Sequence, residues 1–196
     1  MSTTHRARLG LRRAALLTLA LCGWLFAGAA VQAQNRVFFI NVDKAGAVTD
    51  IEGTILDESK KEVAVRPLKG NKVVIAAENV IDIFYAVGKP DLQAEYKKAW
   101  DADQTAAKTA GALERKRLLE EAIKKYQELY PKLDKEKNAQ RHVQFRIANL
   151  SAHAAGADRT KLFASIDLLE KFLKEHPDSW QSFRGEQQLK LMKGGK

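Results

Sequence analysis

The side chains that most often carry out chemistry are few and widely spaced in this chain. Three of its four histidines, His142, His153 and His176, lie in the C-terminal half. His142 and His153 are eleven residues apart. That spacing is about 16 Å along one predicted helix, too far for the two rings to share a metal ion. Asp101 and Asp103 are two residues apart on another predicted helix, so their carboxylates point to different faces.

Motifs that would indicate an enzyme are also missing from the sequence. It contains no HExxH, no CxxC and no glycine-rich phosphate loop, and no serine lies in a glycine elbow. Asn41, Asp43 and Asp50 surround a predicted turn but lack the spacing of a calcium-binding loop. Turn geometry alone favours such residues. We therefore expect no catalytic residue, no metal and no cofactor, and we classify the protein as a non-enzyme.

The first 33 residues indicate where the protein works. Four arginines between residues 6 and 13 form a basic head, an apolar run follows over residues 14–28, and Val31 and Ala33 occupy the −3 and −1 positions of a cleavage site. This order is that of a secretory signal peptide. We expect residues 1–33 to be removed and the protein to be periplasmic or secreted. The alternative is an uncleaved membrane anchor, because residues 14–35 carry no charge and are long enough to span a bilayer.

Net charge and cysteine content narrow the set of partners. The chain carries a net charge of +9, and the four arginines of residues 1–33 account for four of these charges, which leaves +5. The remaining basic and acidic residues are intermixed, whereas a nucleic-acid-binding protein usually gathers basic residues on one face. We therefore expect no nucleic-acid partner. The single cysteine, Cys22, lies within the predicted signal peptide, so the mature chain has no thiol.

Residues 34–89 have the pattern of a small β domain. Apolar runs rich in β-branched residues alternate with polar turns, and they cover residues 37–40, 48–56, 63–65, 73–75 and 81–85. This pattern predicts a small antiparallel β-barrel or sheet of five strands. Gly53, inside the second run, stands where a barrel strand would bend. Residues 51–55, 63–65, 73–75 and 80–83 resemble the SH3-like and Sm-like small barrels of bacterial envelope proteins, which implies a docking platform.

Residues 90–193 have the apolar period of about five helices, followed by a tail at residues 194–196. Pro90 and Asp91 mark the boundary, and Asp91 is a candidate cap for the first helix. Gly156 is expected to end the third helix. Asp158 or Thr160 is expected to start the fourth helix. The fold class that we expect is therefore α+β, with the strands first and an array of helical hairpins second.

The helix before Pro177 resembles the closing helix of a tetratricopeptide unit. A small residue, Ser165, lies twelve positions before the proline, and Leu169 and Leu173 lie eight and four positions before it. In that family the small residue lets the paired helix approach closely. Pro131 ends an earlier helix in a similar way, but the two prolines are 46 residues apart, whereas the family period is about 34. A divergent pair of long helical hairpins fits this spacing, and the array could instead be of another hairpin type.

Aromatic residues in the helical half are the candidate partner-binding residues. Tyr96, Trp100, Tyr126 and Tyr130 could line a groove, since arrays of helical hairpins bind partners on their concave face. The sequence thus predicts an exported interaction or scaffold module with a protein partner in the cell envelope. It would contact the membrane only if the N-terminal segment is retained. The alternative is a structural envelope component that self-associates or binds cell-wall polymer.

Overall fold

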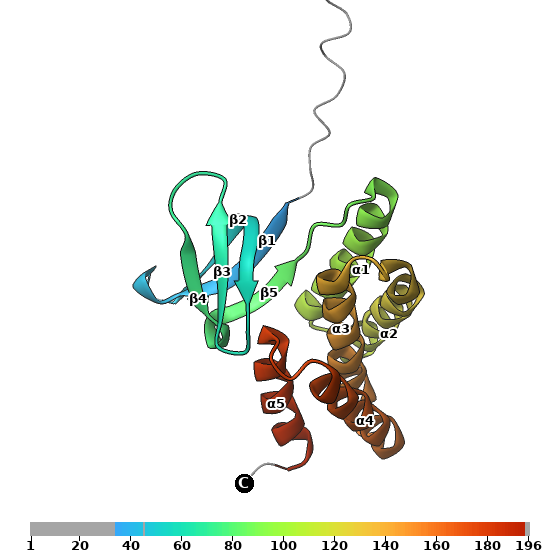
Figure 1. The fold of residues 1–196 in the computed structure, drawn as a ribbon. Helices are drawn as coiled ribbons and strands as arrows, with labels where there is room; N and C mark the ends of the chain where they lie inside the picture. The colour runs from blue at the N-terminus through green and yellow to red at the C-terminus, as the bar shows by residue number, and fades with distance from the viewer. Residues whose placement is uncertain (1–33, 45, 195–196) are drawn as a thin grey trace, which may run out of the picture. The chain divides into compact units, whose positions relative to one another are not determined.

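The computed structural model describes residues 34–44 and 46–194, which form a five-stranded sheet followed by five helices (Figure 1). The fold is therefore α+β, as the sequence predicts. The predicted signal peptide at residues 1–33 lies outside the described residues, as does most of the predicted tail. The strands are β1 (Asn35–Asn41), β2 (Ala47–Glu58), β3 (Glu62–Pro67), β4 (Val73–Ala76) and β5 (Val80–Phe84).

The strands form one antiparallel sheet in the order β4-β3-β2-β1-β5. Strands β4 and β5 lie at its two edges and do not pair with each other, so the sheet is open. Of the two predicted alternatives, a barrel or a sheet, the structure has the sheet. A short 3-10 helix, η3 (Ala77–Asn79), joins β4 to β5, and another, η2 (Val42–Lys44), follows β1.

Gly53 lies where the long strand β2 passes from one partner strand to the next. It pairs with Asn35 of β1 and with Pro67 of β3. A Cβ atom at this position would lie 2.2 Å from the backbone oxygen of Arg66. The glycine is therefore required because the two backbones approach closely, and any side chain would force β2 and β3 apart.

The five helices lie where the 3.6-residue period predicts them. They are α1 (Pro90–Lys108), α2 (Ala112–Leu129), α3 (Lys137–Ala155), α4 (Arg159–Glu175) and α5 (Trp180–Met192), with a 3-10 turn, η4 (Tyr130–Leu133), after α2. Asp158 caps α4 by accepting a hydrogen bond from the backbone N–H of Lys161 at 3.1 Å. Gly156 ends α3 with a φ of 55°, in the left-handed region that favours glycine.

The start of α1 differs from the prediction. Its capping position is occupied by Lys89, which makes no side-chain capping bond, and Pro90 is the first helical residue. Asp91 lies one residue further on, inside the first turn. There its carboxylate interacts favourably with the positive end of the helix dipole, but it does not cap the helix.

A single apolar core connects the sheet to the helices. Val37 and Ile83 of the sheet belong to the same buried cluster as Tyr96 of α1, Tyr126 of α2 and Trp180 of α5. The described residues accordingly form one compact unit. The transition near residue 90 is therefore a change of secondary structure within a shared core. A smaller cluster of Phe145, Ala148, Leu169 and Phe172 lies between α3 and α4.

Candidate functional site

The four predicted aromatic residues do not line one groove. Tyr96 and Tyr126 are fully buried, so their side chains belong to the core and cannot contact a partner in this structure. Trp100 and Tyr130 are half-buried and border separate cavities. The reason is the packing of α1 against the sheet. Tyr96 stacks on Phe84 at 4.9 Å between ring centroids, which turns this side of α1 inward.

Trp100 joins the same contact surface between α1 and the sheet. Its ring stacks on Phe38 of β1 at 5.5 Å, and its Nε1–H donates to an Asp82 carboxylate oxygen at 3.1 Å. One edge of the ring borders a cavity of about 650 Å3 between the sheet and α1, which Arg146 of α3 also lines. The tryptophan is thus held in place by the sheet and is only partly open to solvent.

Behind Trp100, three buried polar residues connect β5, α1 and α3. His142 of α3 lies with Nδ1 2.7 Å from the Tyr96 hydroxyl and Nε2 2.7 Å from an Asp82 carboxylate oxygen. Burial opposes ionisation of Asp82, but the neighbouring His142 and Arg146, together with the hydrogen bonds, hold the pKa of its carboxyl well below its usual range. Asp82 is therefore an anion in a nearly dry environment.

The Tyr96 hydroxyl and the Asp82 carboxylate each have a defined protonation state. Burial raises the pKa of Tyr96 well above its ordinary value, so its hydroxyl keeps its proton. The ionised Asp82 can only accept, so Nε2–H of His142 donates to it, and Nδ1 of the same ring lies within hydrogen-bond distance of the Tyr96 hydroxyl. The side-chain polar atoms of Asp82, Tyr96 and His142 then all have hydrogen-bond partners. The arrangement joins three elements, which makes it a structural connection, and His142 is a satisfied core histidine.

A buried ion pair between Arg146 and Asp103 forms a second connection. Arg146 donates to both carboxylate oxygens of Asp103, at 2.7 and 2.6 Å, and Tyr126 donates to the same carboxylate at 3.3 Å. This pairing is bidentate, the strongest geometry for an arginine and a carboxylate. Asp101, two residues earlier, is exposed and pairs with Lys97 at 2.6 Å. The prediction that Asp101 and Asp103 point to different faces is therefore confirmed.

A third connection holds α5 to the sheet. The Tyr85 hydroxyl accepts a hydrogen bond from Nε1–H of Trp180 at 2.9 Å and donates to Glu58 of β2 at 2.6 Å. Burial raises the pKa of Tyr85 far above its usual value, so the hydroxyl remains a donor. Glu58 also forms an ion pair with Arg141 of α3. Sequence reasoning did not find these three buried connections. One signal for the first of them was present, since the acidic Asp82 interrupts an otherwise apolar strand.

Another open surface, largely apolar, lies on the helices. Two cavities of about 170 and 220 Å3 lie along α3, between α2 with η4 on one side and α4 on the other. Leu168 of α4 borders both cavities, which makes them adjacent. We call this surface the helical groove. Its lining residues are Glu120, Ile123, Tyr130, Gln144, Ile147, Ala148, Ser151, Ala154, Ala155, Lys161, Ala164, Ser165, Leu168 and Lys171.

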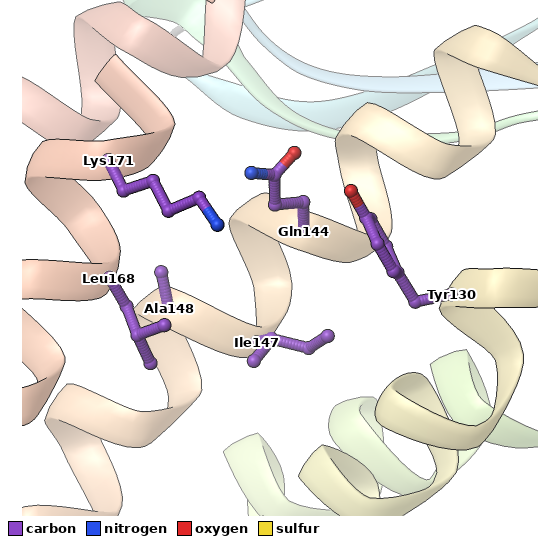
Figure 2. Close-up of a pocket in the computed structure, with 6 residues that line it drawn as sticks. All are labelled: Tyr130, Gln144, Ile147, Ala148, Leu168 and Lys171. Carbon is purple, nitrogen blue, oxygen red and sulfur yellow. The ribbon is translucent and has the colours of Figure 1, made fainter. Parts of the chain in front are cut away.

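Figure 2 shows the end of the helical groove nearest η4. Tyr130 stands on one side and Lys171 and Leu168 on the other, with Ile147 and Ala148 of α3 between them. Tyr130 is thus the one of the four predicted aromatic residues that borders this groove. Ser165 is buried, and its hydroxyl donates to the Lys161 carbonyl at 2.7 Å.

Neither a metal centre nor a membrane span is found in the part of the chain that the structure describes. Among residues 34–44 and 46–194, no three His, Cys, Asp or Glu side chains gather into a group that could hold a metal ion. No helix in those same residues combines the length and apolar character needed to cross a membrane. Comparison of the chain with protein-family models, with curated proteins and with solved structures found no match.

Proposed function

We propose that this protein is an exported, non-enzymatic interaction module that binds a segment of a partner protein in the helical groove. The observation that supports this proposal most directly is the apolar lining of the groove. Leu168 borders both cavities and leaves 40% of its surface exposed. Ile123 and Ile147 are also only half-buried. Apolar surface of this kind gains free energy when a partner covers it.

The dimensions of the groove suit a helical or extended segment. Its floor runs along α3 over the twelve residues from Gln144 to Ala155, and the eleven rises between them span about 16 Å. Small residues, Ala148, Ser151 and Ala155, form much of this floor. They leave room for the larger apolar side chains of a partner, as in other helix-in-groove complexes.

Polar groups at the groove edge would set the orientation of the partner. Lys161 pairs with Glu120 at 3.7 Å across the groove, and both side chains are more than half exposed. Such a surface pair contributes little stability and is easily opened. Lys171 stands at the other end of the groove, on the same helix as Lys161. A segment with an apolar strip and carboxylates near its ends would match both lysines.

The proposal includes two family resemblances, one of the sheet and one of the helices. The strand order β4-β3-β2-β1-β5, with a 3-10 turn before β5, is compatible with an SH3-like or Sm-like platform. Two consecutive hairpins, α1 with α2 and α3 with α4, are compatible with a divergent tetratricopeptide-like array. Under this proposal the sheet supports the array, because α1 and α5 are both fixed to it through buried hydrogen bonds.

A structural envelope component that self-associates is the second candidate. Apolar side chains outside the groove favour it, since Leu113 is 85% exposed and Phe163 is 63% exposed. A second copy of the chain would cover such residues. Binding of cell-wall polymer is the other form of this alternative, and both forms predict that the protein sediments with envelope material.

Site-specific photocrosslinking separates these candidates. A photoreactive phenylalanine replaces Leu168, inside the groove, or Phe163, which is exposed on the same helix but borders neither cavity. The proposal predicts a crosslink to one partner protein from position 168 and none from position 163. A crosslinked dimer of the chain itself would favour the self-associating component. Absence of any protein adduct at position 168 would contradict the interaction function.

Export has its own test. We expect the mature protein to begin at Gln34, because Val31 and Ala33 occupy the −3 and −1 positions. N-terminal sequencing of the protein recovered from periplasm or medium checks this. An intact Met1 on protein in the membrane fraction would replace the cleaved signal with the anchor alternative.

A further inference from the structure

A second open cleft lies where α5 packs beside β5 and α3. Its volume is about 440 Å3, within the range of small-ligand sites. It is separate from the helical groove and shares no lining residue with it. The residues that line it are Ile40, Ile81, Phe145, Arg146, Asn149, His153, Arg184, Gln187, Gln188 and Leu191.

The polar lining of this cleft consists of nitrogen-bearing side chains. Two arginines, one histidine, one asparagine and two glutamines face it, and none of the lining residues carries a carboxylate. Each of these side chains can donate a hydrogen bond, whereas an acidic side chain could only accept. A set of donors without a facing carboxylate favours an anionic ligand.

Arg184 supplies the uncompensated charge of the cleft. Its Nη2 donates to the backbone oxygens of Glu78 at 2.8 Å and Val80 at 3.0 Å. Its guanidinium forms no ion pair with any acidic side chain among the described residues. The two carbonyls fix the guanidinium in place and leave its full charge. Arg146, by contrast, is already paired with Asp103 through two hydrogen bonds.

The charge count selects a ligand with one negative charge. The charge of Arg146 is neutralised by Asp103, whereas Arg184 has no carboxylate partner among the described residues. A monoanion would therefore balance Arg184. Its Nε and Nη2 donate to the two carbonyls, and its Nη1 can donate to a carboxylate oxygen of the ligand. A doubly charged phosphate would leave one negative charge without a partner.

The apolar residues indicate what the carboxylate is attached to. Leu191 leaves 73% of its surface exposed and Ile81 leaves 40% exposed, on opposite sides of the same cleft. Ile40 and Phe145 complete the apolar surface. A ligand that places methylene or leucine-like groups here would cover these side chains while its charged end reaches the arginine.

We propose that this cleft binds the carboxylate end of an apolar chain, with Arg184 receiving the carboxylate and Ile81 and Leu191 contacting the chain. The carboxylate can belong to a free fatty acid or to the C-terminus of an apolar peptide. The chemistry of recognition is the same in both cases. This site does not depend on the helical groove, so either proposal can fail without the other.

Calorimetric titration of the protein with four probes tests the ligand class. Octanoate and octanol differ only in the charged end, and so do acetyl-Leu-Leu and its C-terminal amide. Each carboxylate is expected to bind at least tenfold more tightly than its neutral counterpart. Tighter binding of octanoate indicates a fatty acid, and tighter binding of the peptide indicates a C-terminus. Equal binding of acid and neutral probe, or no binding of either acid at millimolar concentration, would overturn the proposal.

Two isosteric variants test the place of binding. Gln188→Glu and Asn149→Asp each add a negative charge inside the cleft with almost no change of shape, and each is expected to weaken carboxylate binding at least tenfold. Gln127→Glu makes the same change on an exposed position of α2, outside the cleft, and is expected to leave affinity within twofold. Thermal unfolding verifies that the variants are folded. Unchanged affinity in a folded Gln188→Glu or Asn149→Asp protein would contradict the site.

Discussion

The sheet–helix junction and the helical groove use their polar groups in opposite ways. At the junction, where β5, α1 and α3 meet, charged and polar side chains are buried and paired. Asp82 of β5 pairs with His142 of α3, and Asp103 of α1 pairs with Arg146 of α3. In the groove, the charged side chains are exposed at the edge and the lining is apolar. The junction therefore fixes the elements relative to one another, and the groove is left with apolar surface that a partner can cover.

This comparison separates stability from binding. Buried, paired charges are costly to disturb, because removal of one partner leaves the other charge without compensation. Exposed apolar groups at the groove can change with little effect on folding and a large effect on association. Substitutions at the junction should thus act on the free energy of unfolding, and those in the groove on partner binding.

The largest effect is expected at Asp103. It is 1% exposed, and Asp103→Ala would leave the Arg146 guanidinium buried without its carboxylate. We expect a loss of about 3–5 kcal/mol in the free energy of unfolding. The control is Asp101→Ala on the same helix, which removes an exposed pair and should cost less than about 1 kcal/mol. Urea denaturation measures both, and similar midpoints would mean that the buried pair does not hold the junction.

A somewhat smaller effect is expected at Gly53. Gly53→Ala places a Cβ 2.2 Å from the Arg66 backbone oxygen, so β2 and β3 must separate, at a cost of about 3 kcal/mol. Gly111→Ala provides the control, since the nearest atom to its Cβ would be 3.9 Å away. Thermal unfolding followed by circular dichroism compares them. An unchanged melting temperature for Gly53→Ala would show that the sheet can relax at this position.

Asp82 should give the protein a specific loss of stability in acid. Its pKa is lower in the folded chain than in the unfolded chain, where it is about 3.9. The stability that the ionised group contributes is therefore fully present above that pKa and is lost as the pH falls toward the lower, folded value. Asp82→Asn should cost about 2 kcal/mol at pH 7. The difference between the two proteins should narrow below about pH 4.

Urea denaturation of the protein and of Asp82→Asn from pH 7 to pH 3 provides this measurement. Other carboxylates titrate in the same range, but they are common to both proteins and cancel in the difference. A difference that stays constant down to pH 3 would contradict the assignment of an ionised Asp82 in the folded state.

The smallest effect concerns two serines that border the same part of the helical groove. Ser165→Leu introduces a large side chain at a buried position between helices, and overpacking there should cost about 1.5 kcal/mol. Ser151 is only half-buried, and it lines the cavity of about 220 Å3. Because Ser151 is less buried than Ser165, its new side chain displaces fewer neighbours, and Ser151→Leu should cost less than Ser165→Leu. Equal denaturation midpoints would remove this distinction.

Ser151→Leu also tests the groove itself. The new side chain fills space that the partner is proposed to occupy, so crosslinking from position 168 should decrease while the protein remains folded. Retention of the crosslink in this variant would place the partner elsewhere on the molecule.

The sequence alone determined the local structure. Alternation with period two and apolar spacing of 3.6 residues predicted the strands and helices, because those periods reflect which face of each element is buried. Gly156 and Asp158 predicted a helix end and a helix start, because their effects act on the backbone within a few residues. The spacing of Asp101 and Asp103 predicted that they separate to different faces, for the same local reason.

Only the tertiary structure decided which polar side chains meet and which aromatic residues are open. Asp82 and His142 are 60 residues apart, Asp103 and Arg146 are 43 apart, and Tyr85 and Trp180 are 95 apart. No local pattern encodes such pairs, because they depend on how α1, α3 and α5 pack against the sheet. The same packing buried Tyr96 and Tyr126 and left Tyr130 at the groove, although all three have similar places in their helical patterns. The choice among them depends on the neighbouring elements and not on the helix that carries each residue.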